Sequence, residues 1–297
     1  MSTSPAHPAA RSLAECVRAG VSDLAAAGHD HASARIDAEV LARHILRWDA
    51  ATWLSRQREN ASVAFRANFV RAIERRRAHE PVAYITGTRE FYGRSFVVSS
   101  SVLIPRPETE LVVDEALAAI AEVSARLLAP RVADIGTGSG CLAVTIALES
   151  RTARITATDI SDAALAVAVE NAARLGVEGR IAFRRTSLLG GASDAFDLIV
   201  SNPPYVPARD RGMLAPDVRD YEPANALFGG DDGLDVIREL LPAAARALTP
   251  GGWLLMEIGA GHADAVSDLV RANTALTFVR IVPDLAGIPR VVVARRS

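Results

Sequence analysis

Hydrophobic residues recur at helical spacing near the start of the chain. Leu13, Val17 and Val21 are four residues apart, and similar stripes follow until about residue 80. This spacing places apolar side chains on one face of a helix and predicts a small helical bundle over residues 11–81. Residues 1–10 are rich in Ser, Pro and Ala without such periodicity, and they are predicted to be a mobile tail.

Arginines surround the last apolar stripe of this segment, which includes Phe65 and Phe69. They could form a docking patch for an acidic partner, but charged runs on helices usually face solvent. We therefore interpret them as a solvated helix face. These residues are Arg71, Arg75, Arg76 and Arg77.

Short β-branched and aromatic runs broken by glycine follow over residues 82–107. This pattern predicts a β-hairpin linker. Pro107, followed closely by two glutamates, is typical of a first helical turn, because proline is tolerated there and carboxylates favour the positive helix end. We expect a helix from Pro107 to about residue 128, so that the second domain covers residues 108–297.

Segments of strand and helix pattern then alternate, which is typical of an α/β fold. Strands are predicted at 131–135, 154–158, 181–184, 196–201, 252–258, 277–282 and 289–295. Helices are predicted from residue 140, and at 162–175, 234–248 and 263–272. The simplest arrangement is a mostly parallel, doubly wound Rossmann-like sheet whose last two strands pair through a tight turn.

Composition narrows the class of protein. The chain has 297 residues, of which 49% are apolar and 23% are charged, values typical of globular proteins. All 33 basic residues are arginine, and 35 acidic residues leave a net charge of -2. Direct nucleic-acid binding is therefore not expected. No apolar run reaches the roughly 20 residues of a membrane span, so no membrane association is expected and the chain is predicted to be cytoplasmic.

Cysteines and histidines give no metal signal. Cys16 and Cys141 are the only cysteines, too few and too far apart for a disulfide framework or a zinc site. The six histidines do not form a ligand pattern. No metal cofactor is predicted.

Three spaced glycines follow the predicted strand at 131–135, in the segment Asp-Ile-Gly-Thr-Gly-Ser-Gly of residues 134–140. Glycines let the backbone turn sharply and approach a ligand at a helix N-terminus. Asp159, at the end of the next strand, can accept both hydroxyls of a ribose. Dinucleotides and S-adenosylmethionine both suit this geometry. The spacing departs from G-x-G-x-x-G, and the carboxylate of Asp134 would suit an α-amino group better than a pyrophosphate, which favours S-adenosylmethionine.

The segment Asn202-Pro203-Pro204-Tyr205 directly follows the predicted strand at 196–201. Both prolines lack an N–H group and stiffen the backbone, so the segment offers carbonyl acceptors with few competing donors. The side-chain carbonyl of Asn202 and the backbone carbonyl of Pro203 could each take one N–H of a planar NH₂ group, while Tyr205 stacks on its plane. We expect an amide or an aromatic amine as the nucleophile.

These motifs resemble those of the glutamine N5-methyltransferases that modify bacterial peptide chain release factors, and the resemblance spans nearly the whole chain. Besides the glycine loop and residues 202–205, the matching segments are Pro-Val-Ala-Tyr-Ile-Thr-Gly at 81–87, Phe-Tyr-Gly at 91–93, Val-Leu-Ile-Pro-Arg-Pro-Glu-Thr-Glu at 102–110, Asp-Val-Arg at 217–219, Tyr-Glu-Pro at 221–223 and Asp-Leu-Ala-Gly at 284–287.

The resemblance implies a class I methyltransferase domain with a seven-stranded sheet and a helical domain that docks the substrate. It implies methyl transfer from S-adenosylmethionine, leaving S-adenosylhomocysteine, to the glutamine of the Gly-Gly-Gln motif of release factors, which modulates translation termination. Residues 202–205 would bind the glutamine, with Asn202, Pro203 and Tyr205 as the catalytic positions. Cofactor contacts would come from Asp134, Gly136, Thr137, Gly138, Ser139, Gly140, Asp159, Ser187, Leu188 and Asn202. Many relatives have an acidic residue and an aromatic near the adenine, where this chain has Ser187 and Leu188.

Other functions fit parts of the sequence. A glutamine methyltransferase of a ribosomal protein would have the same catalytic tetrapeptide. An adenine-N6 methyltransferase of nucleic acid would use the same acceptors on a flipped base, against which the near-neutral charge argues. A nicotinamide-dependent oxidoreductase would leave residues 202–205 unexplained. A non-catalytic protein with a decayed cofactor site is the remaining alternative.

Overall fold

The computed structural model describes residues 11–190 and 195–297. The predicted tail at 1–10 lies outside the described residues. The chain divides into two compact units, with the boundary between Gly87 and Thr88.

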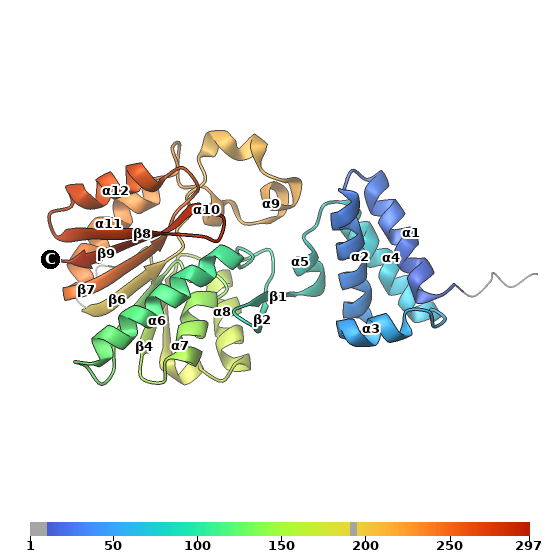
Figure 1. The fold of residues 1–297 in the computed structure, drawn as a ribbon, viewed down its shortest axis with the longest axis horizontal. Helices are drawn as coiled ribbons and strands as arrows, with labels where there is room; N and C mark the ends of the chain where they lie inside the picture. Colours follow the sequence, from blue (N-terminus) through green and yellow to red (C-terminus); the bar gives the residue numbers. More distant parts are fainter. Residues whose placement is uncertain (1–10, 191–194) are drawn as a thin grey trace, which may run out of the picture. The chain divides into compact units, whose positions relative to one another are not determined.

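The first unit is a helical bundle, as predicted, and Figure 1 shows its helices in blue and cyan. Polar side chains cap its helices: Ser12, for example, forms a capping box with Glu15 at the start of the first helix. Its core is apolar and includes Leu24, Leu41 and Phe65. The helices are α1 (Leu13–Ala26), α2 (His31–Leu46), α3 (Ala50–Arg56), α4 (Val63–Arg77) and α5 (Val82–Thr86).

The prediction that the arginines of α4 face solvent is wrong for Arg76. Arg71, Arg75 and Arg77 are exposed, whereas Arg76 is 9% exposed. Its Nε donates to Asp37 Oδ2 of α2 at 2.7 Å. A buried guanidinium needs such a partner, so Arg76 joins α4 to α2 inside the bundle.

The predicted hairpin linker is shorter than expected, because residues 82–86 form the helix α5 instead of a strand. Pro81 precedes this helix, and Gly87 ends it in the left-handed conformation with φ 74°. These end signals outweigh the β propensity of the intervening residues. The hairpin itself consists of β1 (Thr88–Phe91) and β2 (Arg94–Val97), joined by two residues that both have positive φ.

The second unit opens with this hairpin, which the sequence had placed outside the second domain. The expected helix follows it, starts as the 3₁₀ turn η1 (Pro107–Thr109), continues as α6 (Glu110–Ser124) and ends four residues before the predicted end. A seven-stranded sheet follows, with strand order β5-β4-β3-β6-β7-β9-β8. Its strands are β3 (Arg131–Ile135), β4 (Arg154–Asp159), β5 (Ile181–Arg185), β6 (Phe196–Ser201), β7 (Leu248–Glu257), β8 (Leu276–Pro283) and β9 (Pro289–Arg296).

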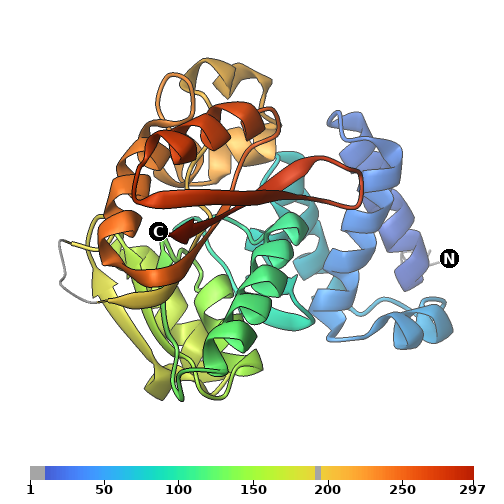
Figure 2. The same cartoon turned by 60° about the vertical axis from the view of Figure 1, so that its left-hand side comes forward.

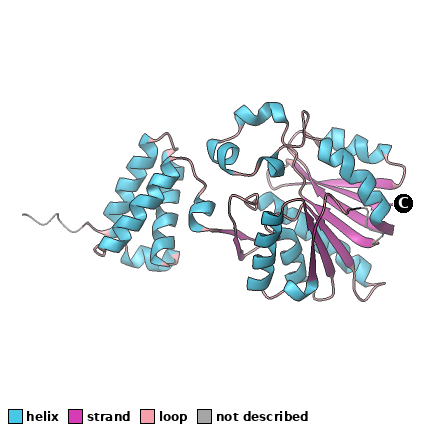
Figure 3. Ribbon diagram, turned by 180° about the vertical axis from the view of Figure 1, so that it is seen from behind, coloured by secondary structure: helices cyan, strands magenta, loops and turns pink. Residues whose placement is uncertain are grey.

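Helices cover both faces of this sheet, as Figure 3 shows. One apolar cluster joins α6, α7 (Cys141–Glu149) and α8 (Asp162–Arg174) to alternate strand residues such as Val132 and Leu198. A second joins α11 (Asp235–Ala247) and α12 (Ala263–Ala272) to the intervening residues, such as Ala133 and Ile199. Alternation places successive side chains on opposite faces, so both faces are buried.

The strand directions confirm the predicted mostly parallel, doubly wound sheet. The strands from β5 to β7 run parallel, and β9 is antiparallel to both β7 and β8. Figure 2 shows β8 and β9 as the paired red strands. The strand order reverses between β3 and β6, whose last residues are Ile135 and Ser201. Ligands of open α/β sheets bind at such a reversal.

Candidate functional site

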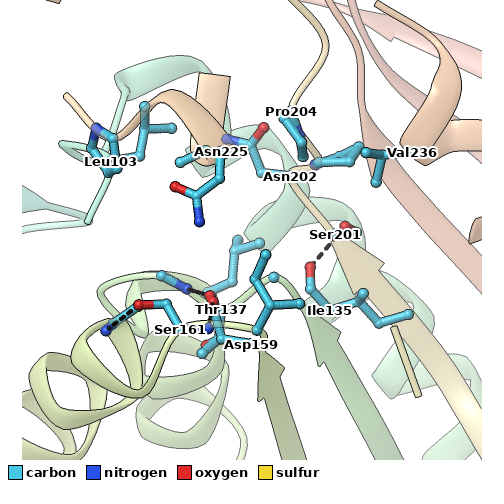
Figure 4. Close-up of a pocket in the computed structure, with 18 of the residues that line it drawn as sticks. Leu103, Ile135, Thr137, Asp159, Ser161, Ser201, Asn202, Pro204, Asn225 and Val236 are labelled. Atoms are coloured by element: carbon cyan, nitrogen blue, oxygen red, sulfur yellow. Dashed lines mark hydrogen bonds between the residues drawn. The ribbon is translucent and has the colours of Figure 1, made fainter. Parts of the chain in front are cut away.

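A cavity lies at the carboxyl edge of the sheet, where β3, β4 and β6 end. Its lining includes most of the residues predicted from the sequence: Gly136, Thr137, Gly138, Ser139, Asp159, Ser187, Leu188, Asn202, Pro203 and Pro204. In Figure 4, Thr137 and Asp159 lie on one side, and Asn202, Pro204 and Asn225 lie on the other. Asp134, Gly140 and Tyr205 are not part of this lining.

The glycine loop after β3 adopts a backbone conformation that residues other than glycine rarely adopt. Gly136, Gly138 and Gly140 have φ of 72°, 54° and 80°. An added Cβ would meet nothing within 4 Å at Gly136 or Gly138, whereas at Gly140 it would lie 3.1 Å from Ala168 Cβ. The first two glycines therefore leave open space along the cavity, and the third allows close packing of the loop on α8.

Asp159 ends β4 beside this loop. Its Oδ2 accepts from Gly138 N at 2.9 Å, and its Oδ1 accepts from Ser161 N at 2.9 Å. Each carboxylate oxygen has two lone pairs, so each can accept one further hydrogen bond. Asp159 thus holds the loop and still offers two acceptors to a diol.

Asp134 is fully buried next to the glycine loop. Its Oδ2 accepts from Thr137 Oγ1 at 2.7 Å and from Ala143 N at 3.1 Å, at the first turn of α7. Burial raises its pKa to about 7. The side chain thereby holds the loop against α7, and its contact with a ligand stays a prediction.

The raised pKa of Asp134 predicts a pH dependence of stability. The folded chain keeps a proton that the unfolded chain, with a pKa of 3.8, releases between roughly pH 4 and pH 7. This carboxyl therefore makes the free energy of unfolding fall as pH rises through that window. We expect Asp134→Asn to remove this contribution. Urea unfolding of the ligand-free chain at about pH 5 and about pH 8 measures it. If the free energies of unfolding of wild type and variant differ by the same amount at both pH values, the assignment is wrong.

Asn202 follows the last residue of β6 and reaches toward η1. Its Nδ2 donates to Thr109 Oγ1 at 3.1 Å. Ser201, just before it, donates from Oγ to the backbone oxygen of Ile135 at 2.8 Å, which ties the ends of β6 and β3 together. The Asn-Pro-Pro-Tyr segment therefore begins at a fixed point on the edge of the cavity.

Sequence reasoning missed two buried residues of this region, Thr109 and Glu257. Thr109 Oγ1 donates to Glu257 Oε2 at 2.6 Å, and Tyr205 donates from its hydroxyl to Glu257 Oε1 at 3.1 Å. Burial raises the pKa of Glu257 above its usual value. An acidic residue that ends an apolar run of β7 was the available signal, because such a residue is costly to bury without a role.

Two further polar residues, Glu222 and Asn171, connect segments next to the cavity, and neither was predicted from the sequence as a site residue. Glu222 accepts from Ile104 N at 3.1 Å and pairs with Arg106 at 2.5 Å, which joins the segments that carry Leu103 and Pro223 of the cavity lining. Asn171 of α8 donates from Nδ2 to the backbone oxygens of Ser139 and Val97, each at 2.9 Å.

Within residues 11–190 and 195–297, no group of three or more His, Cys, Asp or Glu side chains is arranged to hold a metal ion. In the same described part of the chain, no helix combines the length and the apolar character that crossing a membrane requires.

The second unit is similar to methyltransferases in sequence and in fold. Residues 110–215 match the methyltransferase small domain family. The hMettl16 catalytic domain, solved in complex with a MAT2A 3'UTR hairpin, has a TM-score of 0.55 at 16% identity, over 72% of this chain and 80% of that one. A methyltransferase from Pyrococcus furiosus has a TM-score of 0.50 at 16% identity, over 69% and 90%. The second unit has the class I, Rossmann-like methyltransferase fold.

Sequence relatives define the family. Residues 15–87 match the PrmC N-terminal domain family. A release factor glutamine methyltransferase of Koribacter versatilis is 45% identical over 90% of this chain and 93% of its own length. One from Cereibacter sphaeroides is 44% identical over 95% and 98%. The chain belongs to the family of release factor glutamine methyltransferases.

Proposed function

We propose that this chain transfers a methyl group from S-adenosylmethionine to the side-chain amide nitrogen of the glutamine in the Gly-Gly-Gln motif of release factors. One observation carries the proposal: a single cavity is lined by a glycine loop with its diol-binding carboxylate and by the Asn-Pro-Pro segment. A site that holds both a methyl donor and a planar amide needs these two parts side by side.

The residues present fit the methyl donor. Gly136 and Gly138 leave open space along the cavity, and Asp159 keeps two free lone pairs for ribose hydroxyls. Ser187 and Leu188 line the part of the cavity that follows β5, where the adenine is expected. When bound, S-adenosylmethionine supplies an electrophilic methyl group on a sulfonium.

The chain's own residues orient the acceptor nitrogen. An amide nitrogen is a weak nucleophile because its lone pair is delocalised, so closeness and orientation must supply much of the acceleration. The Asn202 side-chain oxygen and the Pro203 backbone oxygen each accept one N–H of the glutamine amide. Both acceptors favour the positive charge that develops on nitrogen as the sulfur–methyl bond breaks and the nitrogen–methyl bond forms. The nitrogen then releases one proton to solvent, which leaves a neutral N-methylamide. Tyr205 is not part of the cavity lining, and its hydroxyl donates to Glu257, so we assign it to the support of the Asn-Pro-Pro segment. We assign Asp134 and Gly140 to the support of the loop beneath the cofactor.

Comparison of acceptors tests the proposed substrate. Purified release factor, a ribosomal protein mixture and adenine-containing nucleic acid are each incubated with the chain and methyl-labelled S-adenosylmethionine. We expect label in the release factor only, because the chain matches release factor glutamine methyltransferases over 90% and 95% of its length. Preferential labelling of ribosomal protein or nucleic acid would replace the proposed acceptor.

A further inference from the structure

A buried hydrogen-bonded network joins the Asn-Pro-Pro-Tyr segment to the end of β7. It runs from Asn202 Nδ2 to Thr109 Oγ1, and from Thr109 Oγ1 to Glu257 Oε2. Tyr205 donates to the second oxygen of the same carboxylate. Thr109 and Glu257 are 1% and 2% exposed, so water does not compete for the hydrogen bond between them, whereas Asn202 and Tyr205 are half-buried.

The direction of each donation in this network is fixed by the number of protons available. The hydrogen bonds that Thr109 and Tyr205 donate to Glu257 lower its pKa and so oppose the effect of burial, which favours the carboxylate. A carboxylate has acceptors only, so Glu257 receives the single hydroxyl proton of Thr109. The oxygen of Thr109 can then act only as an acceptor toward Asn202. The amide of Asn202 must therefore turn its NH₂ group to Thr109, which leaves Oδ1 for a ligand.

We propose that Thr109 and Glu257 are positioning residues that select the orientation of the Asn202 amide, so that its oxygen and not its nitrogen meets the substrate amide. This inference rests on the proposed function. The two ends of an asparagine amide have nearly the same shape, so packing alone does not distinguish them. In the flipped orientation, the NH₂ of Asn202 would face the NH₂ of the glutamine, and two donors would oppose each other.

Thr109, Glu257 and Asn202 come from three different elements that meet at one edge of the sheet. Thr109 ends the 3₁₀ turn that introduces α6, Glu257 ends β7, and Asn202 follows β6. Because β6 and β7 are parallel neighbours, Asn202 and Glu257 lie at the same edge of the sheet, and Thr109 bridges them. One buried charge thus fixes both Asn202 and Tyr205.

The variant Thr109→Val tests the inference, because it removes the hydroxyl and keeps the shape of the side chain. We expect kcat for release factor methylation to fall about tenfold, the scale of one lost orienting hydrogen bond. We expect KM and the affinity for S-adenosylhomocysteine to stay within about twofold. Thr109→Ser, which keeps the hydroxyl, is expected to recover most of the rate. If Thr109→Val does not fold, Thr109→Ala replaces it.

A double-mutant cycle separates positioning from general support of the fold. In the Asn202→Ala background Thr109→Val is expected to cause no further loss, because Thr109 acts through the amide that is then missing. Equal losses in both backgrounds would overturn the inference, as would a Thr109→Val variant with wild-type kcat.

Nuclear magnetic resonance provides a readout that does not depend on activity. The side-chain NH₂ protons of Asn202 should exchange slowly with solvent in the wild type and rapidly in Thr109→Val. Fast exchange in both would refute the assigned orientation. A wild type that fails to methylate release factor refutes the proposed function instead, and the exchange measurement still decides the orientation.

Discussion

Replacement of Asn202 by alanine is expected to lower the methylation rate of release factor by about 10²- to 10³-fold, as removal of one preorganised polar group does in other active sites. The side-chain oxygen of Asn202 is one of the two acceptors that we assign to the glutamine amide. Without it, the nitrogen is neither oriented nor stabilised as positive charge develops. Single-turnover kinetics with saturating release factor measures this loss.

Cofactor affinity provides the control for that variant. Asp159, which we assign to the ribose, ends β4, and the glycine loop that leaves space for the cofactor follows β3, so calorimetric binding of S-adenosylhomocysteine should change little in Asn202→Ala. If methylation and cofactor binding decline together, Asn202 supports the whole cavity and does not select the acceptor.

Substitution of Gly136 by alanine is expected to weaken S-adenosylhomocysteine binding by about tenfold to a hundredfold, which corresponds to an overpacking cost of roughly 1–3 kcal/mol. Gly136 has φ 72° and lines the cavity, and an added Cβ would enter the open space along it. Isothermal titration calorimetry measures this change.

Gly287→Ala is a matched control for backbone strain. Gly287 lies in the turn between β8 and β9 with φ 79°, and an added Cβ there also meets nothing within 4 Å. Both variants should lose about 1 kcal/mol of stability from the left-handed backbone. Only Gly136→Ala should lose cofactor affinity. Equal affinity losses in both variants would show that the Gly136 effect comes from strain and not from the cavity.

The parts of this site that could be predicted from the sequence are those that one strand and its following loop determine. The glycine loop and Asn202 both follow apolar strands directly, and parallel pairing of β3 with β6 brings their ends together. Local pattern and the parallel topology were therefore sufficient to place them at one edge.

The parts that could not be predicted depend on contacts between distant positions. Thr109 and Glu257 are 148 residues apart, and Asn202 and Thr109 are 93 residues apart. A period in the sequence carries no information on such pairs. Residues 82–86 show a different cause, because their β-branched and aromatic composition suggests a strand, while Pro81 and Gly87 are compatible with the ends of a short helix.

Localisation of the methyl group decides whether this chain methylates the glutamine of the Gly-Gly-Gln motif. Release factor incubated with the chain and S-adenosylmethionine is digested, and the peptide that contains Gly-Gly-Gln is fragmented in a mass spectrometer. We expect one added methyl group on the side-chain amide of that glutamine, with the signal nearly lost for Asn202→Ala. A methyl group on any other residue, or an unmodified peptide from a chain that binds S-adenosylmethionine, would contradict this expectation.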